Sequence, residues 1–209
     1  SPAYDLRRVW IDEDVLHGYY YGFSNQVLWP LCHGFPSKIN YDIDFWQHYR
    51  RVNKKFADAV AAEVNQDAPI VWIHDYHFTL APSLIRRKLP EKSLLAHFWH
   101  VPWPPWEIFQ RCPHGRDIVI GLLDNDLIGV HTAIDRDHLV RCAQELLDAT
   151  YDPATGALRH DGNRTCLRVA PLTVDAQAFA MEAQSQSSDS FYRQFADKHN
   201  LTDSQIAVG

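Results

Sequence analysis

The chain has 209 residues, of which 46% are apolar, so it is a globular protein with material for one sizeable core and not a disordered one. Its formal net charge of −6 gives no general attraction to nucleic acid or to anionic membranes. No apolar run approaches the roughly 18 residues of a membrane span, and no secretory signal is visible at Ser1.

The first distinctive segment, residues 19–30 (YYYGFSNQVLWP), is rich in aromatic residues. It is either an aromatic part of the core or a sugar-binding surface, because the apolar faces of sugars stack on Trp and Tyr rings. Residues 45–64 follow with the apolar spacing of a strong amphipathic helix. Its basic residues favour a solvated face over a binding patch; they are Arg50, Arg51, Lys54 and Lys55.

The middle of the chain alternates short apolar runs with amphipathic stretches. The runs predict buried strands at residues 68–75, 93–99 and 126–132. Helical patterns follow each of these strands, at residues 80–89, 116–125 and 133–150. Strands and helices that alternate in such short units predict an α/β fold with a parallel sheet.

The last part of the chain, from residue 158, contains a predicted hairpin, a polar region and a short strand-like end. Residues 158–171 place Asp161-Gly162 between two strand-like runs, which predicts a β-hairpin. The chain then becomes polar and rich in Ser and Gln around residues 184–190, as in a linker or a surface helix. Residues 204–209 (SQIAVG) have the composition of the opening of a further strand.

Polar clusters stand where the three predicted strands end, at residues 74–77 (HDYH), 100–104 (HVPWP) and 129–132 (GVHT). Each cluster contains a histidine. Because ligands bind at the carboxyl ends of the strands in open parallel sheets, we expect these clusters to line one cleft.

A metal site is disfavoured at these clusters. His74 and His77 are three residues apart, as are His97 and His100, and odd spacing sends the side chains of a strand to opposite faces. The cysteines form no CxxC pair, and their wide spacing favours reduced thiols in a cytosolic protein; they are Cys32, Cys112, Cys142 and Cys166. We therefore expect neither a metal nor a bound cofactor.

Several residues near the strand ends have more than one interpretation. Asp75 ends an apolar strand and has three interpretations. Its carboxylate would orient sugar hydroxyls, act as a base or cap the following helix. His97 is interpreted as a core or helix-facing histidine. For His100 the residues alone favour neither a functional-site role nor a structural role. Glu107 is interpreted as a residue in the first turn of a helix, in preference to a partner of Asp75 in a glycosidase-like pair.

The turn after the second strand is rigid, because Pro102, Pro104 and Pro105 restrict its backbone and would hold His100 in place. Trp103 and Trp106 either wall the site or pack the turn.

Four segments, in this order, resemble one family: the trehalose-6-phosphate synthases and their retaining glycosyltransferase relatives. They are YGFSNQVLWPLCH, VWIHDYHFTLAPSLIRRKLP, HFWHVPWPPWEIFQRCPHGRDIVIGLLDNDLIGVHT and, more weakly, APLTVDAQAF, within about residues 19–179. The resemblance implies the N-terminal half of a two-domain B-type glycosyltransferase, with Rossmann-like parallel sheets that carry helices on both faces. It implies an acceptor-side domain at residues 1–171, and a crossover and first strand of a truncated nucleotide-sugar-binding domain at residues 172–209.

The resemblance also implies an activity. Glucose would move with retention from a nucleotide sugar, usually UDP-glucose, to glucose 6-phosphate and give trehalose 6-phosphate. Tyr20 and Trp29 would line the acceptor pocket, Asp75 would bind acceptor hydroxyls, and His100 would contact the donor sugar and the reacting centre. The acceptor proton would pass to the leaving phosphate, so the resemblance implies no protein nucleophile and no metal.

Some parts of the family pattern are expected outside the chain: a glycine-rich loop before Ser1, and the Arg and Lys that hold the donor diphosphate after Gly209. We therefore expect the chain alone to be nearly inactive. Tyr21-Gly22 and Thr173 depart from the family pattern, and Thr173 replaces a glycine.

These departures leave two alternatives to the implied activity. One is a sister enzyme with another phosphorylated acceptor, such as glycerol 3-phosphate or a cyclitol phosphate. The other is a non-catalytic homologue that binds sugar phosphates. In every case we expect a cytoplasmic protein with small-molecule partners, open to homo-oligomer formation, and without nucleic-acid or membrane partners.

Overall fold

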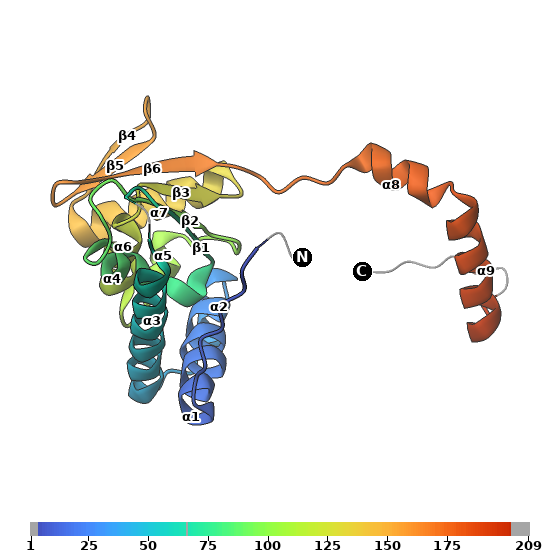
Figure 1. The fold of residues 1–209 in the computed structure, drawn as a ribbon, viewed down its shortest axis with the longest axis horizontal. Helices are drawn as coiled ribbons and strands as arrows, with labels where there is room; N and C mark the ends of the chain where they lie inside the picture. The colour runs from blue at the N-terminus through green and yellow to red at the C-terminus, as the bar shows by residue number, and fades with distance from the viewer. Residues whose placement is uncertain (1–3, 66, 202–209) are drawn as a thin grey trace. The chain divides into compact units, whose positions relative to one another are not determined.

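The structure, a computed structural model, describes residues 4–65 and 67–201. The chain divides into two compact units, Ser1–Pro171 and Leu172–Gly209, which are described separately. The first unit holds the whole described sheet (Figure 1).

The sheet has six strands in the order β1-β2-β3-β6-β5-β4. The first four in this order run parallel, and β5 and β4 are added antiparallel at the far edge. The strands are β1 (Ile70–His74), β2 (Leu94–Phe98), β3 (Leu127–Val130), β4 (Thr150–Asp152), β5 (Ala157–His160) and β6 (Asn163–Val169). The predicted α/β fold with a parallel sheet is confirmed.

Three helices connect the parallel strands. They are α4 (Ala81–Arg86) after β1, α6 (Gly115–Leu123) after β2 and α7 (Ala133–Leu147) after β3. Helix α7 begins with a capping box, in which the Thr132 hydroxyl accepts from the Asp135 amide and the Asp135 carboxylate accepts from the Thr132 amide. It ends where Asp148 adopts a left-handed conformation, with φ of 53°. The predicted extension of this helix to residue 150 is therefore wrong, and Thr150 begins β4 instead.

The segment before β1 is helical throughout most of its length. It contains α1 (Glu13–Leu16), η1 (His17–Leu28), α2 (Trp29–Cys32), the short η2 (Pro36–Lys38) and α3 (Ile43–Glu63). Two short helices follow β1 and β2, namely η3 (Tyr76–Phe78) and α5 (Trp106–Phe109). Helices η1 and α3 lie side by side (Figure 1), and both contribute to the main core through residues such as Phe23 and Tyr49.

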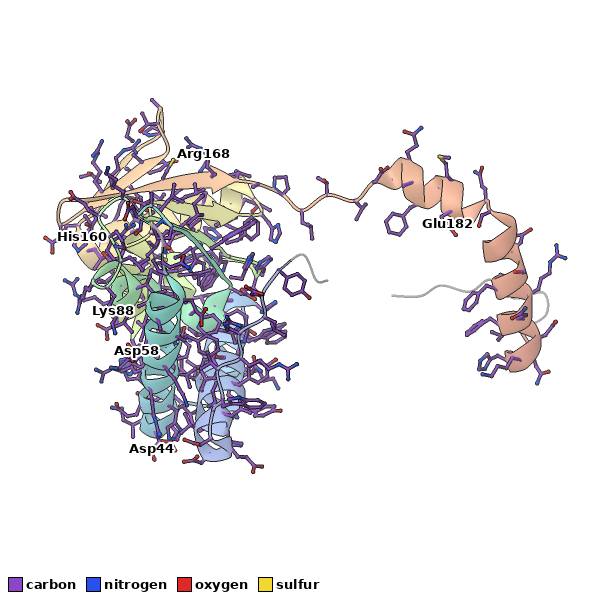
Figure 2. The ribbon with its side chains drawn as sticks, viewed as in Figure 1. Asp44, Asp58, Lys88, His160, Arg168 and Glu182 are labelled. Atoms are coloured by element: carbon purple, nitrogen blue, oxygen red, sulfur yellow. The ribbon has the colours of Figure 1, made fainter. Side chains whose placement is uncertain are left out.

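Two of the four basic residues on the flank of α3, Arg51 and Lys54, pair with neighbouring carboxylates. Lys54 pairs with Asp58 at 2.7 Å, Arg51 pairs with Asp12 at 3.3 Å, and Lys88 after α4 reaches the same Asp58 (Figure 2). These exposed pairs contribute little stability each. The interpretation of this flank as a solvated face agrees with the pairing.

Strand β1 is less buried than its sequence predicts. Ile70 and Trp72 are 75% and 64% exposed, whereas Ile73 is 7% exposed. The reason is that β1 lies at the edge of the described sheet, and only the face that carries Ile73 packs against the helical core. An apolar run alone does not distinguish this one-sided burial from burial on both faces. The neighbouring β2 does follow the prediction, since Leu95, Ala96 and His97 are all buried.

The predicted hairpin is confirmed. Strands β5 and β6 pair antiparallel around Asp161 and Gly162, whose φ values are 50° and 81°. Positive φ at both central residues is the mark of a type I′ turn.

The second unit is helical, with α8 (Ala176–Ala183) and α9 (Gln186–His199). The Ser- and Gln-rich region is therefore a pair of helices rather than an extended linker. The strand predicted at residues 204–209 lies outside the described residues. Among the helices of the described ranges, none has both the length and the apolar character needed to cross a membrane.

Helix α6 approaches the turn after β1 so closely that only glycine fits at one position. A Cβ atom at Gly121 would lie 2.2 Å from the carbonyl oxygen of Thr79. We expect Gly121→Ala to lower the free energy of unfolding by about 1–3 kcal/mol, because two backbones must separate. Urea denaturation of the chain measures this. Asp117→Ala, on the exposed face of the same helix, is the control and should cost less than about 1 kcal/mol; equal values for the two variants would contradict the prediction.

Candidate functional site

The carboxyl ends of β1, β2 and β3 bring three histidines together. The Nδ1 atom of His74 lies 2.9 Å from Nε2 of His100. The ring of His131 meets the ring of His100 edge to face, with 5.9 Å between their centroids. The parallel register of the strands causes this, since it aligns residues 74, 98 and 129 across the sheet. The strand ends lie together as expected, and the cleft that they would line stays a prediction.

Asp75, at the end of β1, has a backbone conformation that L-residues rarely adopt. Its φ is 67° and its ψ is 177°. A residue other than glycine in this region costs on the order of 1–3 kcal/mol and persists only where its surroundings hold it. Such strain is concentrated at functional sites, which singles out Asp75 independently of its charge.

The Asp75 side chain turns toward β2. Its Oδ1 atom accepts from the backbone N–H of His100 at 3.3 Å. Although Asp75 immediately precedes η3, its carboxylate makes no capping hydrogen bond to that helix. The capping interpretation of Asp75 is therefore wrong. Asp75 and His100, which the sequence places on separate strands, are in direct contact.

The backbone of Asp75 is held by two consecutive residues of β2. Its N–H donates to the carbonyl oxygen of Phe98 at 2.8 Å. Its carbonyl oxygen lies 3.0 Å from Nε2 of His97. Because a carbonyl oxygen can only accept, the imidazole carries its proton on Nε2 in this contact. His97 is a core histidine, as predicted, and it also touches the site residue.

Burial lowers the pKa of His97 from its ordinary value of 6.5 to about 4, so the ring is neutral at pH 7. Burial also lowers the pKa of His100, assisted by His74 and His131 and opposed by Asp75. A neutral His100 can both donate to and accept from a hydroxyl group.

Acid should therefore destabilise the fold through His97. Its folded pKa lies below its unfolded pKa, so its stabilisation is complete above pH 6.5 and is lost as the pH falls toward 4. Between pH 7.5 and 4.5 we expect a loss of about 2–3 kcal/mol from this residue, measured by urea denaturation of the chain. Glutamine does not titrate, so the His97→Gln variant should lose less free energy of unfolding than the parent chain over this pH range, by that same amount. The same pH dependence in both proteins would contradict the assignment.

A stack of rings connects Tyr20 to the two residues that follow Asp75, Tyr76 and His77. Its ring stacks on His77 with 5.3 Å between centroids and 13° between planes, and Tyr76 stacks on His77 at 4.1 Å. Tyr20 remains 40% exposed. The hydroxyl of Tyr76 donates to Asn25 of η1 at 3.0 Å, which ties the aromatic segment to the turn after β1.

The segment that carries Tyr20 is a π-helix of 12 residues. π-helical turns are rare and frequently occur at functional sites. Trp29, nine residues after Tyr20, begins α2, is 42% exposed and stacks on His33 at 4.0 Å. The two rings have different partners, His77 for Tyr20 and His33 for Trp29.

Two buried polar residues of α3 hold the turn after β1, and the sequence interpretation missed both. The hydroxyl of Tyr49 donates to the carbonyl oxygen of Tyr76 at 2.6 Å. The Asn53 amide donates to the carbonyl oxygen of His77 at 3.1 Å and accepts from the amides of Leu80 and Ala81. An Asn on the apolar face of an amphipathic helix is the signal that was available.

The turn after β2 is packed and not open. Trp103 is 1% exposed, its backbone N–H donates to Asp135 at 2.9 Å, and its ring packs against Trp99 and Phe109. Of the two alternatives for Trp103, a wall of the site or packing of the turn, the structure supports packing. Trp106 packs against the same core. Glu107 lies in the first turn of α5, as predicted.

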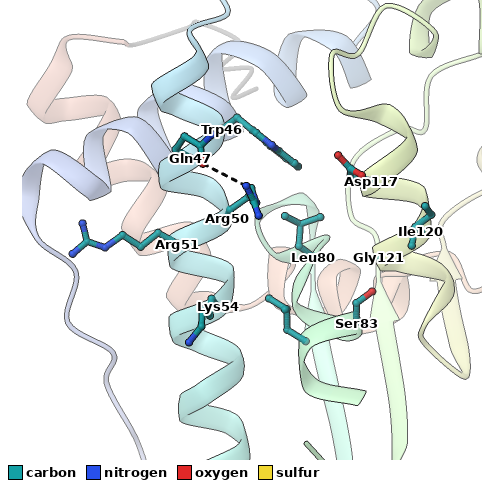
Figure 3. A pocket seen from close by; sticks show the side chains of 11 residues that line it. Trp46, Gln47, Arg50, Arg51, Lys54, Leu80, Ser83, Asp117, Ile120 and Gly121 are labelled. Atoms are coloured by element: carbon teal, nitrogen blue, oxygen red, sulfur yellow. Dashed lines mark hydrogen bonds between the residues drawn. The ribbon is translucent and has the colours of Figure 1, made fainter. Parts of the chain in front are cut away.

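A cavity of about 750 Å³ lies between α3, α4 and α6 (Figure 3). It is lined by cationic side chains of α3, among them Arg50, and by apolar residues of the other two helices together with Ser83 and Asp117. Its lining contains none of the four predicted site residues. Arg50 makes a long contact of 3.5 Å with Gln47 of its own helix. This cavity is separate from the strand-end cluster.

The strand ends present one carboxylate and the imidazoles of His74, His100 and His131, and Tyr20 adds an exposed aromatic ring beside His77. Such groups suit sugars, because carboxylates and imidazoles bind hydroxyls while a ring stacks on an apolar sugar face. Within residues 4–65 and 67–201, no group of three or more His, Cys, Asp or Glu residues is arranged to hold a metal ion.

The chain matches the family model described as "Glycosyltransferase family 20" over residues 1–206. Among curated proteins it is 35% identical over 182 residues to "Alpha,alpha-trehalose-phosphate synthase [UDP-forming] 1" of Aspergillus niger. That alignment covers 86% of this chain and 35% of the relative. The chain thus spans about a third of the length of the curated relatives it matches.

Solved structures agree in fold. A structure described as trehalose-6-phosphate from E. coli bound with UDP-2-fluoro glucose matches with a TM-score of 0.78 and 31% identity, over 84% of this chain and 38% of that one. The α,α-trehalose-phosphate synthase (UDP-forming) from Burkholderia xenovorans, in complex with glucose-6-phosphate, matches with a TM-score of 0.80 and 26% identity, over 88% of this chain and 41% of that one.

Proposed function

Because this chain belongs to glycosyltransferase family 20, we propose that the protein transfers glucose from UDP-glucose to glucose 6-phosphate and forms trehalose 6-phosphate. The observation that carries the proposal is the direct contact between Asp75 and His100 at the ends of adjacent strands. Relatives with up to 36% identity are named for this reaction. Two matching structures were determined with a UDP-sugar analogue and with glucose-6-phosphate.

We propose the following division of roles. Asp75 accepts hydrogen bonds from hydroxyls of the acceptor, and the exposed faces of Tyr20 and Trp29 line the acceptor pocket. His100, neutral at pH 7, hydrogen-bonds the donor sugar at the reacting centre. Its backbone N–H keeps the Asp75 carboxylate beside the same point.

In the proposed reaction the acceptor hydroxyl forms a bond to the anomeric carbon of glucose, on the face that UDP leaves. The bond between that carbon and the UDP phosphate oxygen breaks. The hydroxyl proton passes to the leaving phosphate, so configuration is retained without a protein nucleophile and without a metal. Stabilisation of the leaving phosphates is a large contribution in such chemistry.

The division into units at Pro171 supports a corresponding domain assignment. We assign residues 1–171 to the acceptor-side domain, and residues 172–209 to the crossover and start of the nucleotide-sugar-binding domain. We also place the protein in the cytoplasm, with the four unpaired cysteines in support. Its proposed partners are its two substrates and further copies of itself.

One observation favours a second acceptor. Tyr21 is 53% exposed and meets the ring of Tyr20 edge to face at 5.3 Å, so it borders the proposed acceptor pocket. The glycine at position 22 is explained by packing, because a Cβ atom there would lie 2.6 Å from the ring of Phe45. Another phosphorylated acceptor, such as glycerol 3-phosphate or a cyclitol phosphate, is therefore the alternative.

The test uses a protein of full family length that carries this sequence. Release of UDP from UDP-glucose is measured with glucose 6-phosphate, glycerol 3-phosphate and inositol phosphate as acceptors, and the product linkage is determined by NMR. We expect the highest kcat/KM with glucose 6-phosphate, an α,α linkage, and almost no turnover by the 209-residue chain. Preference for another acceptor would establish the alternative. If none of the three acceptors led to UDP release, the proposal would be overturned.

A further inference from the structure

We propose that His97 is a positioning residue, which holds Asp75 in its strained conformation and thereby aims the carboxylate at the acceptor. The inference rests on the proposed function for the identity of the acceptor. It starts from a conflict at residue 75, where a residue other than glycine has φ of 67° and ψ of 177°. Something in the surroundings must hold this conformation.

The strained residue is held on both sides by the end of β2. The bond from the Asp75 amide to the Phe98 carbonyl oxygen uses backbone atoms only, so any residue at position 98 can make it. The bond from Nε2 of His97 to the Asp75 carbonyl oxygen depends on the side chain. In the β1–β2 register His97 lies opposite Ile73, two residues before Asp75, and its ring reaches forward along the strand.

The residues after Asp75 are fixed separately. Tyr49 binds the carbonyl oxygen of Tyr76, and Asn53 binds that of His77. The peptide between Asp75 and Tyr76 is thus placed between two anchors, β2 on one side and α3 on the other. Without the His97 donor the carbonyl oxygen of Asp75 is no longer held, so rotation about the N–Cα bond of Asp75 can relieve the positive φ. That rotation moves the carbonyl group and the carboxylate-bearing Cβ atom together.

A purely structural role explains His97 less well. The residue is 1% exposed, and its Nδ1 atom is buried without a hydrogen-bond partner among the described residues. Burial of an unsatisfied polar atom is unfavourable, and an apolar residue of similar size would avoid it. The bond to Asp75 is what an apolar residue at position 97 cannot provide.

The chain offers a matched pair of substitutions. The amide nitrogen of Gln reaches approximately as far as Nε2 of His, whereas that of Asn reaches only as far as Nδ1. His97→Gln can therefore keep the donor to Asp75, and His97→Asn cannot, although both are neutral amides. His97→Leu fills the volume with no donor.

The first readout is structural and does not depend on any activity. Crystal structures of the 209-residue variants should show residue 75 with positive φ in His97→Gln and outside the positive-φ region in His97→Asn and His97→Leu. If the conformation of Asp75 is unchanged in His97→Asn or His97→Leu, the inference is wrong. If His97→Leu does not fold, the pair of amide variants decides.

The second readout uses the protein of full family length. For His97→Asn we expect kcat/KM for glucose 6-phosphate to fall about 10- to 100-fold, mainly through KM, because the acceptor contact is misplaced. The KM for UDP-glucose should stay within about twofold, and His97→Gln should recover most of the loss. Equal losses in both amide variants, or a loss shared by both substrates, would overturn the positioning role. Absence of transfer by the parent protein would refute the proposed function alone, and the crystal structures would still decide on His97.

Discussion

Replacement of His100 by alanine is expected to lower kcat for glucosyl transfer by about 100-fold or more, the usual effect of removing one preorganised hydrogen-bonding group from a reacting centre. The fold should survive, since His100 lies after the last residue of β2 and its partners, His74 and Asp75, are at the surface edge of the sheet. The Asp75 bond uses the backbone N–H of residue 100, which alanine retains. Steady-state kinetics in the protein of full family length, with urea denaturation beside it, measures both effects.

The control for His100 is another histidine at the end of a strand. His160 ends β5, next to the hairpin turn and on the antiparallel side of the sheet (Figure 2). His160→Ala should leave kcat within about twofold of the parent protein. Similar losses in the two variants, or an unchanged kcat in His100→Ala, would contradict the role assigned to the strand-end cluster.

Replacement of Asp75 by glycine is expected to separate stability from activity. Glycine adopts the φ of 67° without strain, but it has more freedom in the unfolded chain. These effects oppose one another, so the free energy of unfolding should stay constant or rise by up to about 1 kcal/mol. Transfer to glucose 6-phosphate should fall by about 100-fold or more, because the carboxylate that binds the acceptor is lost. Denaturation and acceptor kinetics check the two effects.

Asp161 provides the matched control for this substitution. It is also an aspartate with positive φ, 50°, but it lies in the hairpin turn between β5 and β6. Asp161→Gly should change stability by a similar amount and leave transfer unaffected. A clear loss of stability in Asp75→Gly, or activity close to that of the parent, would show that the strain at Asp75 is not connected with function.

The parts of the fold that follow from local pattern could be predicted from the sequence. Apolar runs gave the positions of β1, β2 and β3, the Asp161-Gly162 pair gave the hairpin, and the strand-end rule brought His74, His100 and His131 to one edge. Their proximity needs only strand direction and register, which the alternation with helices determines.

The parts that depend on long-range packing could not be predicted in this way. The exposure of Trp72 results from the edge position of β1, which no local pattern reveals. The positive φ of Asp75 results from bonds to β2 residues more than 20 positions away. The π-helix from His17 to Leu28 has no distinctive spacing of apolar residues, so the sequence did not predict it.

The same long-range contacts explain why Asp75 retained three interpretations in the sequence. A polar residue between a strand and a helix is commonly a cap. The structure removes that interpretation, because the carboxylate turns to the amide of His100. The strain and the orientation together make Asp75 the most informative residue of the site.

The central claim is that the acceptor binds at the edge formed by Asp75 and His100. A crystal structure of the protein of full family length, with glucose 6-phosphate and UDP bound, tests it most directly. We expect acceptor hydroxyls at hydrogen-bond distance, about 3 Å, from the Asp75 carboxylate, with the His100 ring between acceptor and UDP. Glucose 6-phosphate bound with neither side chain in contact, for example in the cavity between α3, α4 and α6, would contradict it.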